Sequence, residues 1–489
     1  MSKDPKSPAT TMDQYDAMLP AWTKIQTVLD GTAAMRDAGQ QYLPQHDKES
    51  DTAYWERLER CTLLNMTKLT LDSWVGRPFS EPVEIKDDVP TEILALTENI
   101  DTLGSNLNVF SRNWFKEGVA KSYSHVLVDM PRTSERGDGR PRSLEDDRLD
   151  GVRPYWVQIS PEKLFFAEAA IIAGKEVLQE VRFLEEHTRR DGFALVTEEQ
   201  VKRLYLNDEG TVSVEIWRFE AVGKSRKKVW RIYDSWIMDI DQIPIVTFYS
   251  DRQSFMLGKC PIEDLADLNI AHWQSTSDQR AILTVARFPI LACSGGTDET
   301  NKLVVGPNKW LYCPDPQGKF YYVEHTGAAI KAGDQDLTEL ARQMGEYGSE
   351  WMKKRPNRET ATARTLDTAE STSALQDVTL RFQDALENVM MLTAKWLGLD
   401  NGGSLAVYSN FSATPVGGEG LRVLTEARKN RDISRAAFIV ELKRAGVLDE
   451  DFDEKKDADK LEGELMDMLP LIPPSDGADD EPKDDDGDE

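Results

Sequence analysis

The sequence contains few of the residues on which metal sites and disulfide frameworks depend. Only four of its 489 residues are cysteines, and Cys61, Cys260, Cys293 and Cys313 lie far apart without a CxxC pair. Five histidines are scattered along the chain, with no HExxH or HxH arrangement. This spacing argues against a zinc site and is typical of reduced thiols in a cytosolic compartment. We therefore expect no metal ligands and no disulfide bonds.

Long apolar runs are also missing. The longest candidates, such as Phe288–Cys293, are far shorter than the ~20 residues that a membrane-spanning helix needs. The N-terminal segment Met1–Asp13 is polar and has no apolar stretch of the kind found in secretory signals. The composition, with 40% hydrophobic and 30% charged residues, is that of a folded globular protein. These features predict a protein without a membrane span or a secretory signal.

The motifs of common enzymes are absent as well. The sequence has no GxxxxGK[ST] loop for phosphates, no GxGxxG turn after a strand and no GxSxG nucleophile motif. Asp239 and Asp241 lie two residues apart and form a candidate pair of oxygen ligands for Mg²⁺, but the sequence favours a solvated turn before Ile243-Pro244. We therefore predict no catalysis and no cofactor, and a metal-dependent nuclease that uses these two aspartates is the enzymatic alternative.

Negative charge is in large excess. Asp and Glu number 86 against 59 Lys and Arg, a net charge of −27, and two C-terminal segments, 449–468 and 471–489, carry −7 and −8 of it. Tight binding of nucleic acid depends on cations that neutralise phosphates, so this balance argues against sequence-specific DNA binding. It remains compatible with a protein past which DNA must slide without sticking.

Two segments reverse this sign locally. The first has a net charge of +4 within twelve residues and is interpreted as a loop that touches phosphates without recognising bases. The second falls on a predicted hairpin and is expected to be an exposed turn. The cations of the first segment are Lys353, Lys354, Arg355, Arg358 and Arg364; those of the second are Lys224, Arg226, Lys227, Lys228 and Arg231.

The first half of the chain divides into a helical and a β section. Met12–Leu29, Ala53–Val75 and Leu107–Lys121 carry apolar residues at helical spacing, and Pro20 is expected to kink or restart the first helix. Short β-runs separated by turn signals then predict an antiparallel meander. These runs are Tyr155–Ile159, Val177–Leu184, Val201–Leu206, Val212–Phe219, Lys228–Trp236 and Ile243–Tyr249.

The second half is mainly helical, so the predicted fold class is α+β. Two long helices, Pro261–Arg287 and Asp334–Met352, flank a small β insertion over Phe288–Thr326. A third long helix covers Ser371–Leu397. After a strand at Ser404–Phe411, two short helices are predicted at Gly418–Lys429 and Ser434–Lys443, and the Pro-, Asp- and Gly-rich residues 471–489 are expected to be a disordered acidic tail.

One turn of the first long helix differs from the rest. Gln274–Arg280 is polar on every side, and a helix that is polar all round is not expected to dock in its own core. We therefore predict that this turn faces solvent or neighbouring subunits. The side chains assigned to that contact are Gln274, Ser275, Ser277, Asp278 and Arg280.

The order of these elements, together with several short stretches, resembles the portal proteins of tailed double-stranded DNA bacteriophages. The resemblance covers about Tyr15 to Glu464, and no single stretch is a chemical motif. The stretches that carry it are Tyr42-Leu43-Pro44, Asn65-Met66-Thr67, Val75-Gly76-Arg77-Pro78-Phe79, Val126-Leu127-Val128-Asp129, Ile243-Pro244-Ile245-Val246, Asp264–Gly296, Tyr322–Gly327 and Thr360-Ala361-Thr362.

The resemblance implies a phage portal-like fold and a segment-by-segment organisation. It assigns residues 1–255 to a wing of N-terminal helices and β meander, 256–287 to a stem helix, 288–330 to a small β-rich clip and 331–352 to a second stem helix. It further assigns 353–370 to the tunnel loop, 371–416 to a long wing helix and strand, 417–470 to a helical crown and 471–489 to the acidic tail, which has no family role.

The resemblance also implies a structural function without catalysis. A portal protein forms a ring of copies, usually a dodecamer, at one capsid vertex of the virion and is assembled in the host cytoplasm. Double-stranded DNA enters and leaves through its channel without sequence-specific binding. The implied partners are other copies of the chain, the large terminase subunit of the packaging motor, head-to-tail adaptor or tail proteins, and the major capsid and scaffold proteins. Another virion or scaffold component remains an alternative.

Overall fold

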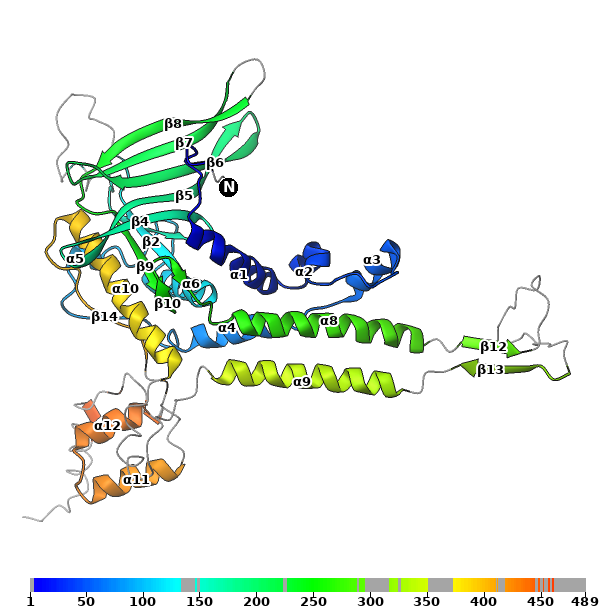
Figure 1. The fold of residues 1–489 in the computed structure, drawn as a ribbon. Helices are drawn as coiled ribbons and strands as arrows, with labels where there is room; N and C mark the ends of the chain where they lie inside the picture. Colours follow the sequence, from blue (N-terminus) through cyan, green and yellow to red (C-terminus); the bar gives the residue numbers. More distant parts are fainter. Residues whose placement is uncertain are drawn as a thin grey trace, which may run out of the picture. The chain divides into compact units, whose positions relative to one another are not determined.

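The structure is a computed structural model that describes residues 4–132, 146, 150–222, 227–287, 290–294, 316–323, 327–350, 373–409, 411, 418–444, 447–448, 452, 456–457 and 460. The chain divides into two compact units, Met1–Ser409 and Asn410–Glu489, which are described separately. The first unit combines helices with antiparallel sheets (Figure 1), so the predicted α+β class is confirmed.

The first unit begins with helix α1, Asp13–Asp30, which buries Tyr15, Met18, Trp22 and Ile25 on one face. The helix continues through Pro20, so it does not restart there, and the kink that the sequence also allowed stays a prediction. Gly31 has a φ of +88° and ends the helix, a conformation that glycine adopts without a steric penalty. The short helices that follow are α2, Thr32–Ala38, and the 3₁₀ helix η1, Gly39–Gln41.

The predicted single helix over Ala53–Val75 is two helices, α3 at Asp51–Arg60 and α4 at Met66–Gly76. The separation has a local cause, because the Asn65 side chain accepts a hydrogen bond from the Lys68 amide and thereby starts a new helix. The backbone at Cys61 is extended, and its carbonyl oxygen accepts a hydrogen bond from Arg36. The helical periodicity of the sequence spans this break and does not reveal it.

A three-stranded sheet and two helices form the centre of the first unit. Its strand order is β3-β2-β9, with all pairs antiparallel. Helices α6 and α10 pack against it, and Asn106 caps α6 as an N-cap residue. The bounds are α6 Leu107–Lys121, β2 Tyr123–Asp129, β3 Tyr155–Ile159, β9 Ile245–Tyr249 and α10 Ala374–Leu397.

A second, five-stranded sheet has the sequential order β4-β5-β6-β7-β8, so the predicted meander is correct for β5 to β8, whereas β4 was not predicted. Six strands were predicted for the meander. Two of them, which correspond to β3 and β9, belong instead to the three-stranded sheet, because both pair with β2. Lys202 Nζ donates to Asp129 Oδ2 at 2.8 Å and joins the two sheets through a buried ion pair. The strands are β4 Leu164–Ile172, β5 Lys175–Asp191, β6 Ala194–Leu206, β7 Val212–Val222 and β8 Lys227–Met238.

Two long helices, α8 at Glu263–Ala286 and α9 at Ala328–Glu350, lie side by side (Figure 1). They flank the antiparallel strands β12, Ile290–Ser294, and β13, Lys319–Val323, so the helix, β insertion and return helix are as predicted. Trp74 on α4 donates its indole N–H to the carbonyl oxygen of Gly348 and fixes the end of α9. The remaining short elements of this unit are β1 Glu84–Ile85, α5 Thr91–Leu94, β10 Arg252–Ser254, β11 Leu257–Gly258 and β14 Leu405–Ala406.

The second unit contains α11, Gly418–Lys429, and α12, Arg435–Arg444. Ser434 caps α12, since its hydroxyl accepts a hydrogen bond from the Ala437 amide at 3.1 Å. Both helices agree with the sequence prediction. The predicted strand Ser404–Phe411, in contrast, shrinks to the two residues of β14 in the first unit.

Candidate assembly site

The polar turn of α8 packs against its own chain through the segment of residues 39–61, which contains α3 and is called the α3 segment. Gln274 Nε2 donates to the carbonyl oxygen of Tyr42 at 2.8 Å, and Arg280 Nη1 donates to the carbonyl oxygen of Arg60 at 2.6 Å. Ser277 between them is only 1% exposed. The polar side chains therefore satisfy backbone acceptors that the α3 segment presents to the helix.

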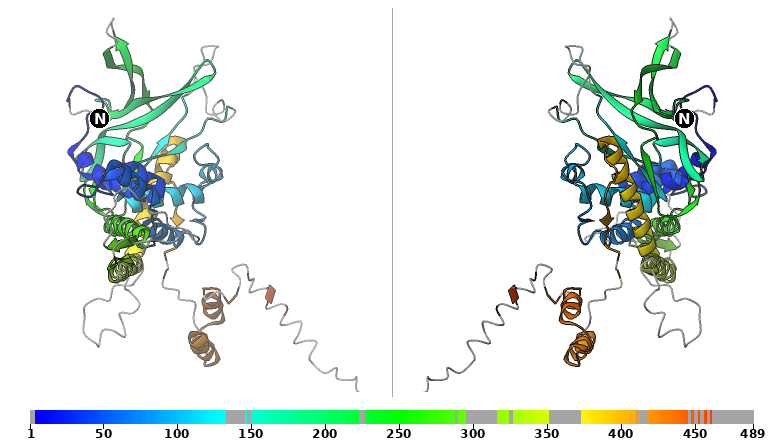
Figure 2. Two further views of the ribbon diagram at one scale, coloured as in Figure 1. Left: turned by 90° about the vertical axis from the view of Figure 1, so that its right-hand side faces the viewer. Right: turned by 90° about the vertical axis from the view of Figure 1, so that its left-hand side faces the viewer.

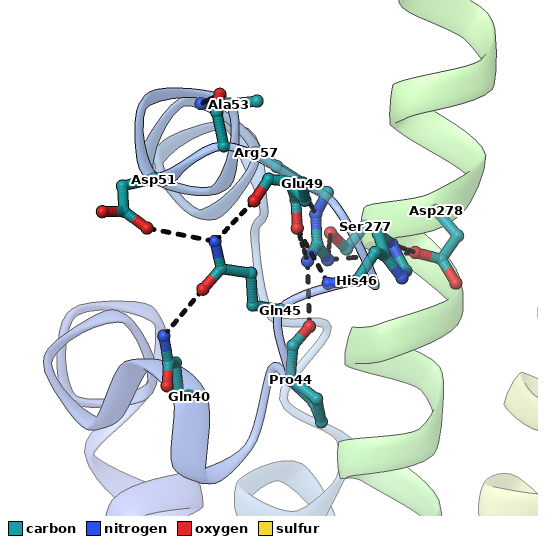
Figure 3. Close-up of polar contacts among 11 residues, drawn as sticks. Gln40, Pro44, Gln45, His46, Glu49, Asp51, Ala53, Arg57, Ser277 and Asp278 are labelled. Carbon is teal, nitrogen blue, oxygen red and sulfur yellow. Dashed lines mark hydrogen bonds and ion pairs between the residues drawn. The ribbon is translucent and has the colours of Figure 1, made fainter.

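A buried ion pair lies at the centre of this contact (Figure 3). Arg57 donates from Nε and Nη2 to the two carboxylate oxygens of Glu49, both at 2.8 Å. The same guanidinium donates to the carbonyl oxygen of Pro44 at 2.9 Å and, through Nη1, to Ser277 Oγ at 3.1 Å. The Arg57 and Glu49 side chains are 6% and 11% exposed, so the pair is largely shielded from water. Its bidentate geometry is the strong form of an arginine–carboxylate contact.

Local hydrogen bonds hold Glu49 in place for this pair. Gln45 Nε2 donates to the carbonyl oxygen of Glu49 at 2.8 Å and to Asp51 Oδ1 at 3.2 Å (Figure 3). Ser50 caps the start of α3 by accepting a hydrogen bond from the Ala53 amide. The turn before α3 thus positions the Glu49 carboxylate against the Arg57 guanidinium.

Helix α9 supplies the hydrogen-bond acceptors for the opposite side of the polar turn. Ser275 Oγ donates to Asp336 Oδ2 at 2.6 Å, and Gln279 Nε2 donates to the carbonyl oxygen of Ile330 at 2.8 Å. A Cβ atom at Gly333 would lie 2.1 Å from Gln279 Oε1, so a larger residue at this position would displace the end of the Gln279 side chain. The polar turn is the point at which α8 contacts both the α3 segment and α9.

These contacts correct one expectation from the sequence. The polar turn was expected not to dock in its own chain, but Gln274, Ser275 and Ser277 are all bonded within it, because the surfaces they meet are themselves polar. Asp278 and Arg280 stay exposed. A cavity of about 220 Å³ beside them is lined by residues of α3 and α8 that include Arg57, Arg60, Ser277 and Arg280. The contact with a neighbouring subunit that was predicted for these five side chains stays a prediction.

Glu49, Arg57 and His46 were not predicted from the sequence. Arg57 lies on the same helix face as Tyr54 and Leu58, each of which is 2% exposed. A cation within an apolar face needs an anionic partner, and this pattern could have indicated the buried pair. His46 Nε2 lies 3.2 Å from Asp278 Oδ1, a contact between exposed side chains that no local pattern predicts.

The other candidate sites from the sequence have different outcomes. The cations of the proposed tunnel loop, Lys353, Lys354, Arg355, Arg358 and Arg364, lie outside the residues that the structure describes. Asp241 forms an ion pair with Lys395 at 3.0 Å, which does not favour the alternative of a Mg²⁺-dependent nuclease. Among the described residues, no group of three or more His, Cys, Asp or Glu side chains could hold a metal ion. No helix in the described part of the chain is long and apolar enough to span a membrane.

The Glu49–Arg57 pair predicts a specific dependence of stability on pH. Hydrogen bonds from Arg57 lower the pKa of the Glu49 carboxyl to about 2, against about 4.3 in an unfolded chain. The folded state then binds fewer protons than the unfolded state between these values, so the stabilisation is complete above about pH 5 and is lost toward pH 2. In thermal unfolding from pH 7 to pH 3, the Tm difference between the wild type and Glu49→Gln should shrink as the pH falls. A difference that stays constant or widens would contradict the assigned role of Glu49.

Comparison with known proteins gives one family match. A family model described as a domain of unknown function (DUF4055) matches residues 261–397, which is less than half of the chain. The matched region runs from just before α8 to the end of α10 and includes the polar turn. The sequence matches no curated protein.

Three solved structures that match this chain come from gene transfer agent (GTA) particles. A chain in the neck of the empty particle, computed with C6 symmetry, has a TM-score of 0.41 and 11% identity, over 76% of this chain and 88% of that one. A chain in the virion of the native particle has a TM-score of 0.40 and 11% identity, over 77% and 89%. A chain in the native neck, computed with C12 symmetry, has a TM-score of 0.38 and 12% identity, over 77% and 89%. No residue role passes from one chain to the other at these values.

Proposed function

We propose that the chain is the subunit of a portal, a ring at one vertex of a virus particle through which DNA is packaged and ejected. The observation that carries the proposal is the α8–α9 hairpin with its β insertion. Its helices of 24 and 23 residues lie side by side and are each about 35 Å long at 1.5 Å per residue. This arrangement supports a stem that ends in a clip, as the resemblance implies.

The charge of α9 supports the passage of DNA without tight binding. The helix carries five acidic residues and two cations, and all five acids are exposed. A surface of this sign repels phosphates, so a duplex can slide along it. The exposed acids are Asp334, Asp336, Glu339, Glu346 and Glu350.

In the proposed ring, the clip contacts the large terminase subunit during packaging and adaptor or tail proteins afterwards, and the outer surface contacts the major capsid and scaffold proteins. The tunnel loop, residues 353–370, provides the local positive charge that contacts DNA. In this proposal, ring assembly depends on contacts between folded parts of the subunits, whereas DNA movement depends on the tunnel loop.

The test neutralises the five tunnel-loop cations together, by the changes Lys353→Gln, Lys354→Gln, Arg355→Gln, Arg358→Gln and Arg364→Gln. We expect rings to assemble normally while the DNA content of particles falls several-fold, because the loop loses its phosphate contacts. Particle DNA is measured by absorbance and gel analysis after nuclease treatment. A matched control neutralises the exposed cations Lys48, Lys86, Lys163, Lys175 and Lys259. Normal DNA content in the tunnel-loop variant would contradict the role of this loop.

A further inference from the structure

The five-stranded sheet forks into two hairpins. β6 and β7 are paired only over residues 201–206 of β6 and 212–217 of β7, so that Leu206 faces Val212 at one end and Val201 faces Trp217 at the other. Beyond that point, β5 and β6 stay paired as far as Asp191 and Ala194, and β7 and β8 as far as Val222 and Lys227. Figure 2 shows the two hairpins pointing in different directions from their common base. Residues 185–200 are called the acidic hairpin, and residues 218–222 with 227–231 are called the basic hairpin.

Each hairpin is a two-stranded ribbon that exposes apolar side chains. Phe193 and Leu195 on the acidic hairpin are fully and 74% exposed, and Phe219 and Val229 on the basic hairpin are 49% and 41% exposed. Two strands alone bury too little surface to be stable in water. Two inner edges have no strand pairing partner among the described residues. They are residues 194–200 of β6 and residues 218–222 of β7. Unpaired edges with exposed apolar side chains indicate surfaces that a partner covers.

The two hairpins carry opposite charges. The acidic hairpin has five acidic residues and two arginines, a net charge of −3, whereas the basic hairpin has four cations and one glutamate, a net charge of +3. Ion pairs within each hairpin, such as Arg189–Glu198 and Arg231–Glu220, leave these sums unchanged. Two acids of the acidic hairpin, Glu185 and Glu186, also pair with Lys202 and Lys163 outside it. No ion pair joins one hairpin to the other in the described part of the chain.

We infer that the basic hairpin of one copy packs against the acidic hairpin of a second copy, which makes the forked sheet a contact between neighbouring subunits. The inference rests on the proposed ring, because every copy in a closed ring must present two different surfaces that complement each other. Opposite charges align the hairpins, and contact between Phe219 on one copy and Phe193 and Leu195 on the next removes these side chains from water. The fork keeps the two hairpins of one chain apart, so each remains available to a neighbour.

Charge reversal tests the contact in the full chain. One variant changes Lys227, Lys228 and Arg231 to Glu, and a second changes the exposed Glu186, Glu198 and Glu199 to Lys. Each should raise the protein concentration for half-assembly, measured by mass photometry, by roughly tenfold or more, since like charges then face each other. A variant with all six changes should assemble within about threefold of the wild type, because the complementarity is restored with exchanged signs. The control changes Lys48, Lys86 and Lys259 to Glu.

Cysteine pairing separates a contact between copies from closure within one chain. Leu195→Cys and Phe219→Cys are placed in a background with Cys293→Ser and Cys313→Ser, in which the remaining Cys61 and Cys260 are buried. Mixing the two single variants under mild oxidation should give covalent dimers, and a chain that carries both should give a ladder of larger species. Intramolecular disulfides alone, or unchanged assembly of the charge-reversed variants, would overturn the inference and leave the proposed ring intact. A wild-type chain that never assembles would contradict the proposed function instead, and absence of mixed dimers between the two cysteine variants would overturn the hairpin contact as well.

Discussion

Replacing Arg57 by methionine is expected to lower the free energy of unfolding of the first unit by about 3 kcal/mol. The change leaves the Glu49 carboxylate, which is 11% exposed, without its cation, and it removes the donor to Ser277 and to the Pro44 carbonyl. An uncompensated buried charge is costly, whereas methionine retains most of the packed volume. Urea unfolding followed by tryptophan fluorescence at pH 7 measures the effect.

Two further variants show whether the lost ion pair is the cause. Arg60→Ala removes an arginine from the same helix whose side chain is 53% exposed and pairs with Glu56, and its effect should stay below about 1 kcal/mol. The double variant Arg57→Met with Glu49→Leu removes both charges, so it should recover most of the loss. Equal effects of Arg57→Met and Arg60→Ala, or a double variant less stable than Arg57→Met, would contradict the assigned role of the pair.

Replacing Phe382 by alanine should lower the free energy of unfolding by about 4 kcal/mol. Phe382 on α10 is fully buried, and its ring centroid lies 5.0 Å from that of Phe248, 5.1 Å from Trp114 and 5.2 Å from Phe115. These edge-on contacts join α10 to α6 and β9. Removing the ring leaves a cavity where these three elements meet, and α10 loses its main anchor.

Leu380→Ala is the matched control, because this leucine lies two residues away on the same helix but is 42% exposed. Its loss should change the free energy of unfolding by no more than about 1 kcal/mol, since little buried area is removed. The two variants are compared by urea unfolding under identical conditions. Similar midpoints for Phe382→Ala and Leu380→Ala would show that the aromatic cluster is not the anchor of α10.

The sequence predicts the elements of this chain better than their contacts. The long helices α8, α9 and α10 follow from apolar residues at helical spacing, and the caps at Asn106 and Ser434 are local. The contact between Arg57 and Ser277 joins residues 220 positions apart, and no periodicity carries that information. The prediction for the polar turn failed for the same reason. A polar helix face indicates that apolar groups do not cover it, but it does not exclude polar partners within the same chain.

The sheets show a similar limit. Alternation and turn signals identify strands, and they place β5 to β8 in a sequential meander. They do not reveal that β2 takes β3 and β9 as its two partners, since that choice depends on packing of α6 and α10. The fork between β6 and β7 is also invisible, because the strands on both sides of it keep their alternation. Only the opposite charges of the two hairpins can be taken directly from the sequence.

The mass of the purified full-length protein in solution tests the central claim most directly. Native mass spectrometry with negative-stain images of the same sample should show a closed ring of many 55.2 kDa chains with a central hole. A ring of this kind would support the portal function and direct attention to the clip and tunnel loop. A 55.2 kDa monomer at every concentration, which also cleaves DNA in the presence of Mg²⁺, would contradict the account.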